Sequence, residues 1–261
     1  MFGKGTKYSF AQKKLGKGKG FGMEREIDLQ EVSDGKLYDA DDLVKVGCND
    51  CEGCSECCRK MGNTILLDPW DMYHLTLGLH TSFEQLLETG RIELNMADGV
   101  ILPNLKLDGE GGGCPFLTIE GRCGIHSFRP GLCRLFPLGR VYENQSFRYF
   151  LQIHECSRQR RTKMKVKKWL DIPDLKSYER FTQDWHDYLK EIRDEVKHTQ
   201  DDVRRKKRNM DVLRTFYLTS WEPIRPDSQA CGTQDRDSSI RDGGFYEQFY
   251  ARLRQTTEGA L

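Results

Sequence analysis

The sequence predicts an α+β fold, in which a small, loop-rich, cysteine-cluster metal-binding domain is followed by a helical C-terminal segment. Three observations support this prediction. The cysteines gather in two groups between residues 48 and 156. Short runs typical of strands and turns lie between and after these groups. Beyond Cys156 the chain is highly charged, and its apolar residues recur at the 3.6-residue period of a helix.

The composition bounds the class of protein. The chain has 261 residues, of which 37% are hydrophobic and 31% charged, a length that suits one large domain or one domain with an appendage. The net charge of +1 argues against a polyanion binder and against an acidic, solvating protein. No run approaches the roughly 18 apolar residues that span a bilayer, so no membrane partner is expected.

The first twenty residues lack the apolar stretch of a secretory signal. We therefore expect a cytoplasmic protein, in which thiols stay reduced. Ten cysteines in that compartment need an explanation other than disulfide bonds. A set of buried, unreactive cysteines is the less favoured alternative.

We expect four regions along the chain. Residues 1–22 contain six lysines and no acidic residue, and they predict a disordered basic arm. We interpret this arm, residues 1–22, as a solvated tail, so no nucleic-acid partner is expected. The metal-binding domain spans about 40–160, and a helical segment spans 165–220. Residues 223–261 form a polar tail, in which only 245–253 has the pattern of a further helix.

Residues 64–90 predict two short helices. The first begins at Asp68, an N-cap residue that is followed by proline at the first helical position. The second is expected to begin with a capping box between Thr81 and Glu84 and to end at Gly90.

Two extended regions follow. Residues 91–107 predict strands with a turn at Asp98–Gly99. Residues 138–141 and 147–153 alternate between apolar and polar, and the polar residues between them predict a hairpin.

The helical segment has one apolar face. A stripe at helical spacing is typical of a helix that packs on a core, and a cofactor-binding face is the less favoured interpretation. The charge run at 201–209 predicts a solvated helix face. The residues of the stripe are Phe181, Trp185, Tyr188, Leu189, Ile192 and Val196.

The first group of cysteines places five thiols within eleven residues. The spacing C-x2-C lets two thiolates meet one zinc ion, and it equally suits the corners of an iron–sulfur cluster. Five thiols exceed the ligands of one mononuclear ion, so further ligands or a second site are implied. The side chains of the adjacent residues Cys57 and Cys58 are expected to point in different directions and to serve neighbouring sites. The group comprises Cys48, Cys51, Cys54, Cys57 and Cys58.

The second group lies in a loop stiffened by prolines and just beyond the predicted hairpin. With the last four thiols of the first group it makes eight ligands, enough for two four-coordinate sites or for one site with additional reactive thiols. Cys48 is a ninth candidate. The second group comprises Cys114, Cys123, Cys133 and Cys156.

Arginine and histidine residues accompany these cysteines. Arg129 and Arg134 bracket Cys133, where they would offset the charge of a thiolate site or hold an anionic substrate as cofactor-binding residues. Alternatively, they bind loop carbonyls. His126 and His154 are less favoured candidate ligands.

No catalytic triad or paired-carboxylate motif is recognisable. The radical S-adenosylmethionine motif C-x3-C-x2-C is also missing, because Met61 stands where its last cysteine would be.

The combined pattern resembles the YkgJ-type cysteine-cluster family. The resemblance covers about residues 48–160 and rests on C-x2-C-x2-C-C at 51–58, Cys114-Pro115-Phe116-Leu117, Cys123-Gly124-Ile125-His126-x-x-Arg129-Pro130-x-x-Cys133-Arg134-x-Phe136-Pro137, and Cys156. His126 departs from the family, which more often has tyrosine there, and Cys48 is an additional thiol. The resemblance implies zinc or iron chelation. Its relatives include flagellin lysine N-methylases, which look like iron–sulfur enzymes that use S-adenosylmethionine.

The sequence favours a [4Fe–4S]-type cluster over zinc, because of the three-residue rhythm of the first group and the Cys114–Pro115 step. Three functional classes remain open. The first is an iron–sulfur enzyme that modifies a protein, such as a lysine methyltransferase. The second is a redox or electron-carrier protein, and the third is a zinc-stabilised interaction module. A protein substrate or partner is expected, and the oligomeric state is not predicted.

Overall fold

The computed structural model describes residues 7–9, 25–26, 28–48, 54–61, 64–107, 113–158, 160–222 and 243–258. Cys51, Cys231, most of the basic arm and most of the polar tail lie outside these ranges. Lys7–Ser9 forms a strand that pairs with Arg140 and Val141, so these three residues differ from the expected disordered arm. Without these residues, the strand that contains Arg140 and Val141 would be an edge strand with unpaired backbone groups.

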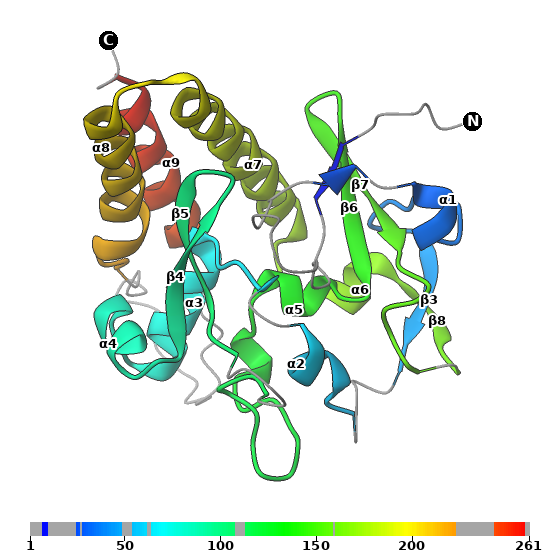
Figure 1. Ribbon diagram of the computed structural model, residues 1–261. Coiled ribbons are helices and arrows are strands. Elements are labelled where there is room, and N and C mark those ends of the chain that lie inside the picture. Colours follow the sequence, from blue (N-terminus) through cyan, green and yellow to red (C-terminus); the bar gives the residue numbers. More distant parts are fainter. Residues whose placement is uncertain are drawn as a thin grey trace, which may run out of the picture.

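The described strands form three antiparallel sheets (Figure 1). The largest has the order β2-β1-β6-β7, and the other two pair β3 with β8 and β4 with β5. The strands are β1 (Lys7–Ser9), β2 (Arg25–Glu26), β3 (Leu43–Gly47), β4 (Ile92–Ala97), β5 (Val100–Leu105), β6 (Leu138–Glu143), β7 (Ser146–Leu151) and β8 (Thr162–Lys165).

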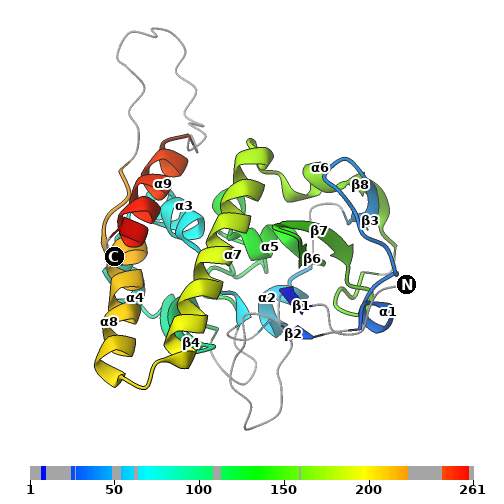
Figure 2. The same ribbon diagram turned by 90° about the horizontal axis from the view of Figure 1, so that it is seen from above.

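The helices divide into short ones near the cysteines and longer ones near the C-terminus. Seen from above, α7 lies between α8 and α9 on one side and the largest sheet with β3 and β8 on the other (Figure 2). The helical elements are α1 (Leu29–Val32), α2 (Glu56–Lys60), α3 (Pro69–Leu79), α4 (Phe83–Glu88), η2 (His126–Phe128), α5 (Gly131–Leu135), α6 (Val166–Leu170), α7 (Leu175–His198), α8 (Asp202–Leu213), η3 (Arg214–Leu218) and α9 (Gly243–Glu258).

The predicted start of α3 is confirmed. The Asp68 carboxylate accepts a hydrogen bond from the Asp71 backbone N–H at 2.8 Å, and the Asp71 carboxylate accepts one from the Asp68 N–H at 3.1 Å. This reciprocal box satisfies two N–H groups that the first turn of a helix leaves unpaired.

The predicted capping box of α4 is wrong by one residue. The N-cap is Ser82, whose hydroxyl accepts from the Gln85 N–H, while the Gln85 side chain accepts from the Ser82 N–H. This frame directs Phe83 and Leu86 into the core, where both are buried. The end of α4 at Gly90 is as predicted, with Gly90 at a φ of 64°.

Both predicted hairpins are confirmed. Asp98 and Gly99 turn β4 into β5 with φ angles of 51° and 88°, and Asn144 and Gln145 turn β6 into β7 with φ angles of 52° and 59°. Positive φ at both central residues is the geometry of a tight two-residue hairpin turn. The turns therefore fix the register of both strand pairs.

The predicted α+β class with a helical C-terminal segment is confirmed, and the six-residue apolar stripe of α7 is buried as predicted. The rings of Phe181, Trp185, Phe216 and Phe249 contact one another at centroid distances of 4.7–6.2 Å. The same hydrophobic cluster includes residues of α3 and of the β4–β5 hairpin, together with Ile125 and Leu135 near the cysteines. A rigid helical core thus supports the cysteine loops.

The predicted further helix at 245–253 is confirmed as α9, which is longer than expected. In the part of the chain that the structure describes, no helix has both the length and the apolar character needed to cross a bilayer.

Candidate metal centre

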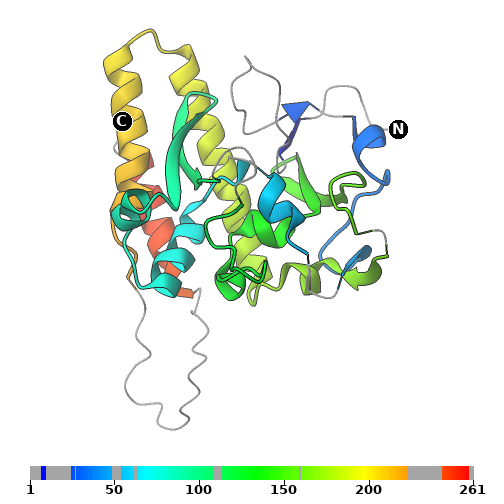
Figure 3. The same cartoon turned by 60° about the horizontal axis from the view of Figure 1, so that its bottom comes forward.

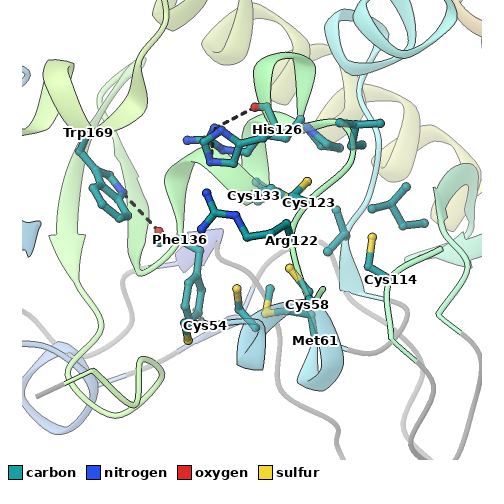
Figure 4. A pocket seen from close by; sticks show the side chains of 18 residues that line it. Cys54, Cys58, Met61, Cys114, Arg122, Cys123, His126, Cys133, Phe136 and Trp169 are labelled. Atoms are coloured by element: carbon teal, nitrogen blue, oxygen red, sulfur yellow. Dashed lines mark hydrogen bonds between the residues drawn. The ribbon is translucent and has the colours of Figure 1, made fainter. Parts of the chain in front are cut away.

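A cavity of about 120 Å³ lies where α2, the loop after β5 and α5 meet. Figure 3 shows α2 next to α5. Figure 4 shows sulfur atoms around the cavity from several directions. The cysteines that line it are Cys54, Cys57, Cys58, Cys114, Cys123 and Cys133.

Helix α2 supplies two of these thiols, Cys57 and Cys58, and Cys54 lies just before its N-cap residue Ser55. Both Cys57 and Cys58 line the same cavity, so the expectation that they point in different directions is wrong here. A hydrogen bond with the Cys58 thiol, together with burial, raises the pKa of Cys57.

The loop 113–125 supplies two more thiols and is tied directly to α2. The Cys114 backbone N–H donates to the Cys58 carbonyl at 2.7 Å. A bridge between Leu117 and Cys123, with a 2.8 Å hydrogen bond from the Gly124 N–H to the Phe116 carbonyl, closes the loop. These bonds bring the two sequence groups of cysteines together across more than fifty residues of chain.

Helix α5 carries the sixth thiol, Cys133, and is held in place by a hydrogen bond to Asp71 of α3. The buried Asp71 carboxylate accepts a hydrogen bond from the Gly131 N–H at 2.7 Å, at the first position of α5. Asp71 therefore caps two helices, its own α3 and the cysteine-bearing α5. Sequence reasoning assigned no role to Asp71, because nothing local indicates a contact sixty residues away.

Arg134 lies behind this helix rather than in the cavity. Its guanidinium donates to the backbone carbonyls of Asp171 at 2.7 Å, of Arg129 at 3.2 Å and of Ser127. Only 5% of Arg134 is exposed. This is the alternative expected from the sequence, an arginine that binds loop carbonyls, and a direct contact of Arg134 with a cofactor stays a prediction.

Two other arginines do line the cavity, Arg129 and Arg122. The Arg129 Nη1 donates to the His126 carbonyl at 2.8 Å and lies about 3 Å from both ring nitrogens of His126. Figure 4 shows the Arg122 side chain extending between His126 and Cys54. Sequence reasoning missed Arg122. Its position directly before a candidate ligand, Cys123, is the signal that could have found it.

The environment of the thiols favours their protonated form in the absence of a cation. Burial and the neighbouring thiols raise the pKa of Cys133 well above its ordinary value. Burial raises the pKa of Cys114 to about 11, against the effect of the Phe116 backbone N–H, which lowers it. Burial also raises the pKa of Cys123, opposed by the Ile125 N–H. A metal that binds here displaces protons.

The remaining candidate ligands lie elsewhere. Cys48 and Cys156 are outside the cavity lining, His154 is exposed, and Cys51 is outside the described residues. None of the eight described cysteines forms a disulfide. Among the described residues, no three Cys, His, Asp or Glu side chains are already positioned to hold an ion.

Comparison with known proteins identifies the segment that carries these thiols. Residues 50–168 match the CxxCxxCC family, described as "Putative zinc- or iron-chelating domain". The match confirms the resemblance predicted from the sequence, and it supports metal binding. The comparison with curated proteins found no match, and neither did the comparison with solved structures.

Proposed function

Because residues 50–168 match a metal-chelating cysteine-cluster family, we propose that the cavity holds a multinuclear iron–sulfur cluster, in the favoured case of the [4Fe–4S] type. One observation carries the proposal: six thiols line a single cavity of about 120 Å³. Thiolates are soft ligands that suit zinc and iron–sulfur clusters and do not suit magnesium or calcium.

The size of the cavity favours a cluster over a single closed zinc site. A zinc ion bound by four thiolates at about 2.3 Å draws the sulfur atoms to roughly 3.8 Å from one another. Such a site uses four of the six thiols and encloses no volume beyond the ion. A cluster of several iron and sulfide ions fills more space and draws its ligands from a wider ring.

The charges around the cavity support the same proposal. A cluster held by four thiolates is an anion, and Arg122 and Arg129 line its cavity as cations. When bound, a cluster of this kind supplies electron transfer or an open iron site. The reduced thiols that it requires agree with a cytoplasmic location, which is part of the proposal.

A second candidate, a protein-modifying methyltransferase, is favoured by the apolar side chains of the cavity. Met61, Leu132, Phe136 and Trp169 line it together with Arg129. An apolar lining with a guanidinium suits a ligand that has apolar and carboxylate parts, as S-adenosylmethionine has. In that reaction a neutral lysine amine attacks the sulfonium methyl, the C–S bond breaks, S-adenosylhomocysteine leaves, and the amine loses a proton.

The first test is chemical analysis of the full chain purified anaerobically. We expect iron and acid-labile sulfide in near-equal amounts, with broad visible absorption that bleaches on reduction. Cys114→Ser combined with Cys133→Ser should abolish both, and Cys231→Ser, which removes a thiol outside the proposed ligand set, should leave both unchanged. Zinc without sulfide would refute the cluster and favour the interaction module.

Calorimetry with the cluster-loaded protein tests the second candidate. We expect S-adenosylmethionine to bind the wild type and to bind Arg129→Gln more weakly, because the variant lacks the guanidinium of the cavity lining. Reversible reduction of the cluster without any S-adenosylmethionine binding would contradict the methyltransferase and favour an electron carrier.

A further inference from the structure

An open groove lies between the C-terminal helices α7 and α9. Its volume is about 500 Å³, within the range of roughly 300–1,000 Å³ that is typical of ligand pockets. All its lining residues belong to α7 and α9, so the groove lies outside the family match at residues 50–168. The lining residues are Ser177, Arg180, Tyr246, Glu247, Tyr250 and Arg254.

The sequence of each helix sets its side of the groove. Tyr246, Tyr250 and Arg254 follow one another at intervals of four residues on α9, and Arg180 and Asp184 are four residues apart on α7. Side chains at this spacing lie on one helix face. The two faces meet, because the Tyr250 hydroxyl donates a hydrogen bond to the Asp184 carboxylate at 2.7 Å. Two ordered helices therefore build the groove.

Two tyrosine rings form the aromatic part of the lining, and the core holds both in place. Only 8% of Tyr246 is exposed, and the centre of its ring lies 6.4 Å from that of Phe181 and 5.3 Å from that of Phe245. The centre of the Tyr250 ring lies 5.2 Å from that of Phe249. Because these rings are already ordered, a ligand that packs on them costs the protein little conformational entropy.

Two arginines give the groove its charge. Arg180 and Arg254 are exposed, and Glu247 is the one carboxylate among the lining residues, so two positive charges and one negative leave the lining at +1. The Arg180 Nε lies 3.7 Å from the Asp184 carboxylate, and 75% of the Arg180 side chain remains exposed. An ion pair this exposed contributes little to stability. Arg180 can therefore turn to an incoming carboxylate at small cost.

The combination of tyrosine and arginine indicates the class of ligand. Both residue types are enriched among those that contribute most to protein–protein binding. A bare anion such as phosphate would leave the two rings uncovered, and an uncharged peptide would not use the arginines. A peptide that presents an apolar side chain flanked by carboxylates is complementary to both features.

We propose that the α7–α9 groove is a docking site for an acidic peptide segment of a partner protein. An apolar side chain of this segment packs on Tyr246 and Tyr250, and its carboxylates pair with Arg180 and Arg254. The site goes beyond the metal centre, because no cysteine lines it and its chemistry does not depend on which metal the cavity holds. It commits the partner to an acidic rather than a basic contact segment.

Fluorescence anisotropy with the full chain tests this docking site. The probe is a labelled short peptide of glutamate and leucine, and the matched peptides carry glutamine or lysine in place of glutamate. We expect the glutamate peptide to bind more tightly than the glutamine peptide, and the lysine peptide not to bind. Arg180→Glu combined with Arg254→Glu should weaken binding of the glutamate peptide by roughly 5–30-fold, which corresponds to the loss of two exposed charge pairs.

Two controls make the result specific to the groove. Lys190→Glu combined with Lys207→Glu reverses the same number of charges at exposed positions of α7 and α8 that do not line the groove, and should leave the affinity nearly unchanged. Ser177→Trp keeps the charge but fills the groove, so it should weaken binding as well. Ser177→Trp decides the outcome if the double arginine variant does not fold.

Four results would overturn the docking site. The first is no binding of the glutamate peptide, or equal binding of the glutamine peptide. The second is an equal loss of affinity in the lysine control, because the attraction would then come from the charge of the whole protein. The third is displacement of the peptide by inorganic phosphate at a similar concentration, which would assign the groove to small anions. The fourth is dimerisation that the arginine double variant abolishes, seen by sedimentation, which would make a second copy the occupant.

Discussion

Replacing Gly131 with alanine tests how tightly α5 is held. Gly131 is the first residue of α5, two positions before Cys133. A Cβ at Gly131 would overlap with the Tyr178 hydroxyl, and Asp71 Oδ1 lies 3.6 Å from the same point. The Tyr178 hydroxyl in turn accepts a hydrogen bond from the buried Arg140 at 3.1 Å. An added methyl group therefore meets a fixed, hydrogen-bonded neighbour.

The expected magnitude follows from opposing effects. In an unhindered helix, alanine in place of glycine stabilises by about 0.5–1 kcal/mol. Here overpacking costs about 1–3 kcal/mol. Either Tyr178 moves away from Arg140, or α5 moves away from Asp71, and losing a hydrogen bond to a charged group costs about 1.5–3 kcal/mol. We expect Gly131→Ala to lower the free energy of unfolding by roughly 2–5 kcal/mol.

Urea unfolding and metal analysis of four proteins provide the assay: the wild type, Gly131→Ala, Tyr178→Phe and the double variant. Tyr178→Phe removes the oxygen that the new methyl group meets, so Gly131→Ala should cost less in that background. A favourable coupling of at least about 1 kcal/mol is expected. Metal content should fall in Gly131→Ala and recover in the double variant. A stabilised Gly131→Ala, or strictly additive effects, would refute the packing described for α5.

Three other predictions concern charged groups. Arg134→Ala should lower the free energy of unfolding by about 2–4 kcal/mol, because buried carbonyls lose their donor; a loss below about 1 kcal/mol in urea unfolding would contradict this role. Arg122→Ala should make the reduction potential of a bound cluster more negative by roughly 10–40 mV, which corresponds to the free energy of an exposed ion pair. Voltammetry that shows no shift, or a positive one, would exclude that charge effect. Burial raises the pKa of Asp68 to about 6, and burial with the Asp68 charge raises that of Asp71 well above its ordinary value. The folded state then keeps protons that the unfolded chain releases above about pH 4, so urea unfolding should show stability falling as pH rises from about 4 through and beyond about 6 in the wild type. The fall should be less steep in Asp71→Asn, which keeps only the contribution of Asp68.

Local chemistry made much of the fold predictable. The proline step after Asp68, the Asp98–Gly99 turn and the apolar stripe of α7 act over a few residues, so the sequence displays them directly. The capping box of α4 was misplaced because Thr81 and Ser82 are both good N-caps. Ser82 is the N-cap because this frame buries Phe83 and Leu86 on one face of the helix. Burial of that face depends on the whole core, which the local sequence does not show.

The sequence by itself determined that the chain carries a cysteine-cluster segment that matches a metal-chelating family, because thiol spacing within a short segment is a local property. Only the tertiary structure decided which thiols meet. It placed Cys114, Cys123 and Cys133 around one cavity with the thiols of α2, and it left Cys48 and Cys156 outside that cavity. It also decided that Arg122 and Arg129 line the cavity while Arg134 binds carbonyls. The physical reason is that these positions are fixed by backbone hydrogen bonds and buried contacts between residues tens of positions apart, which no local pattern records.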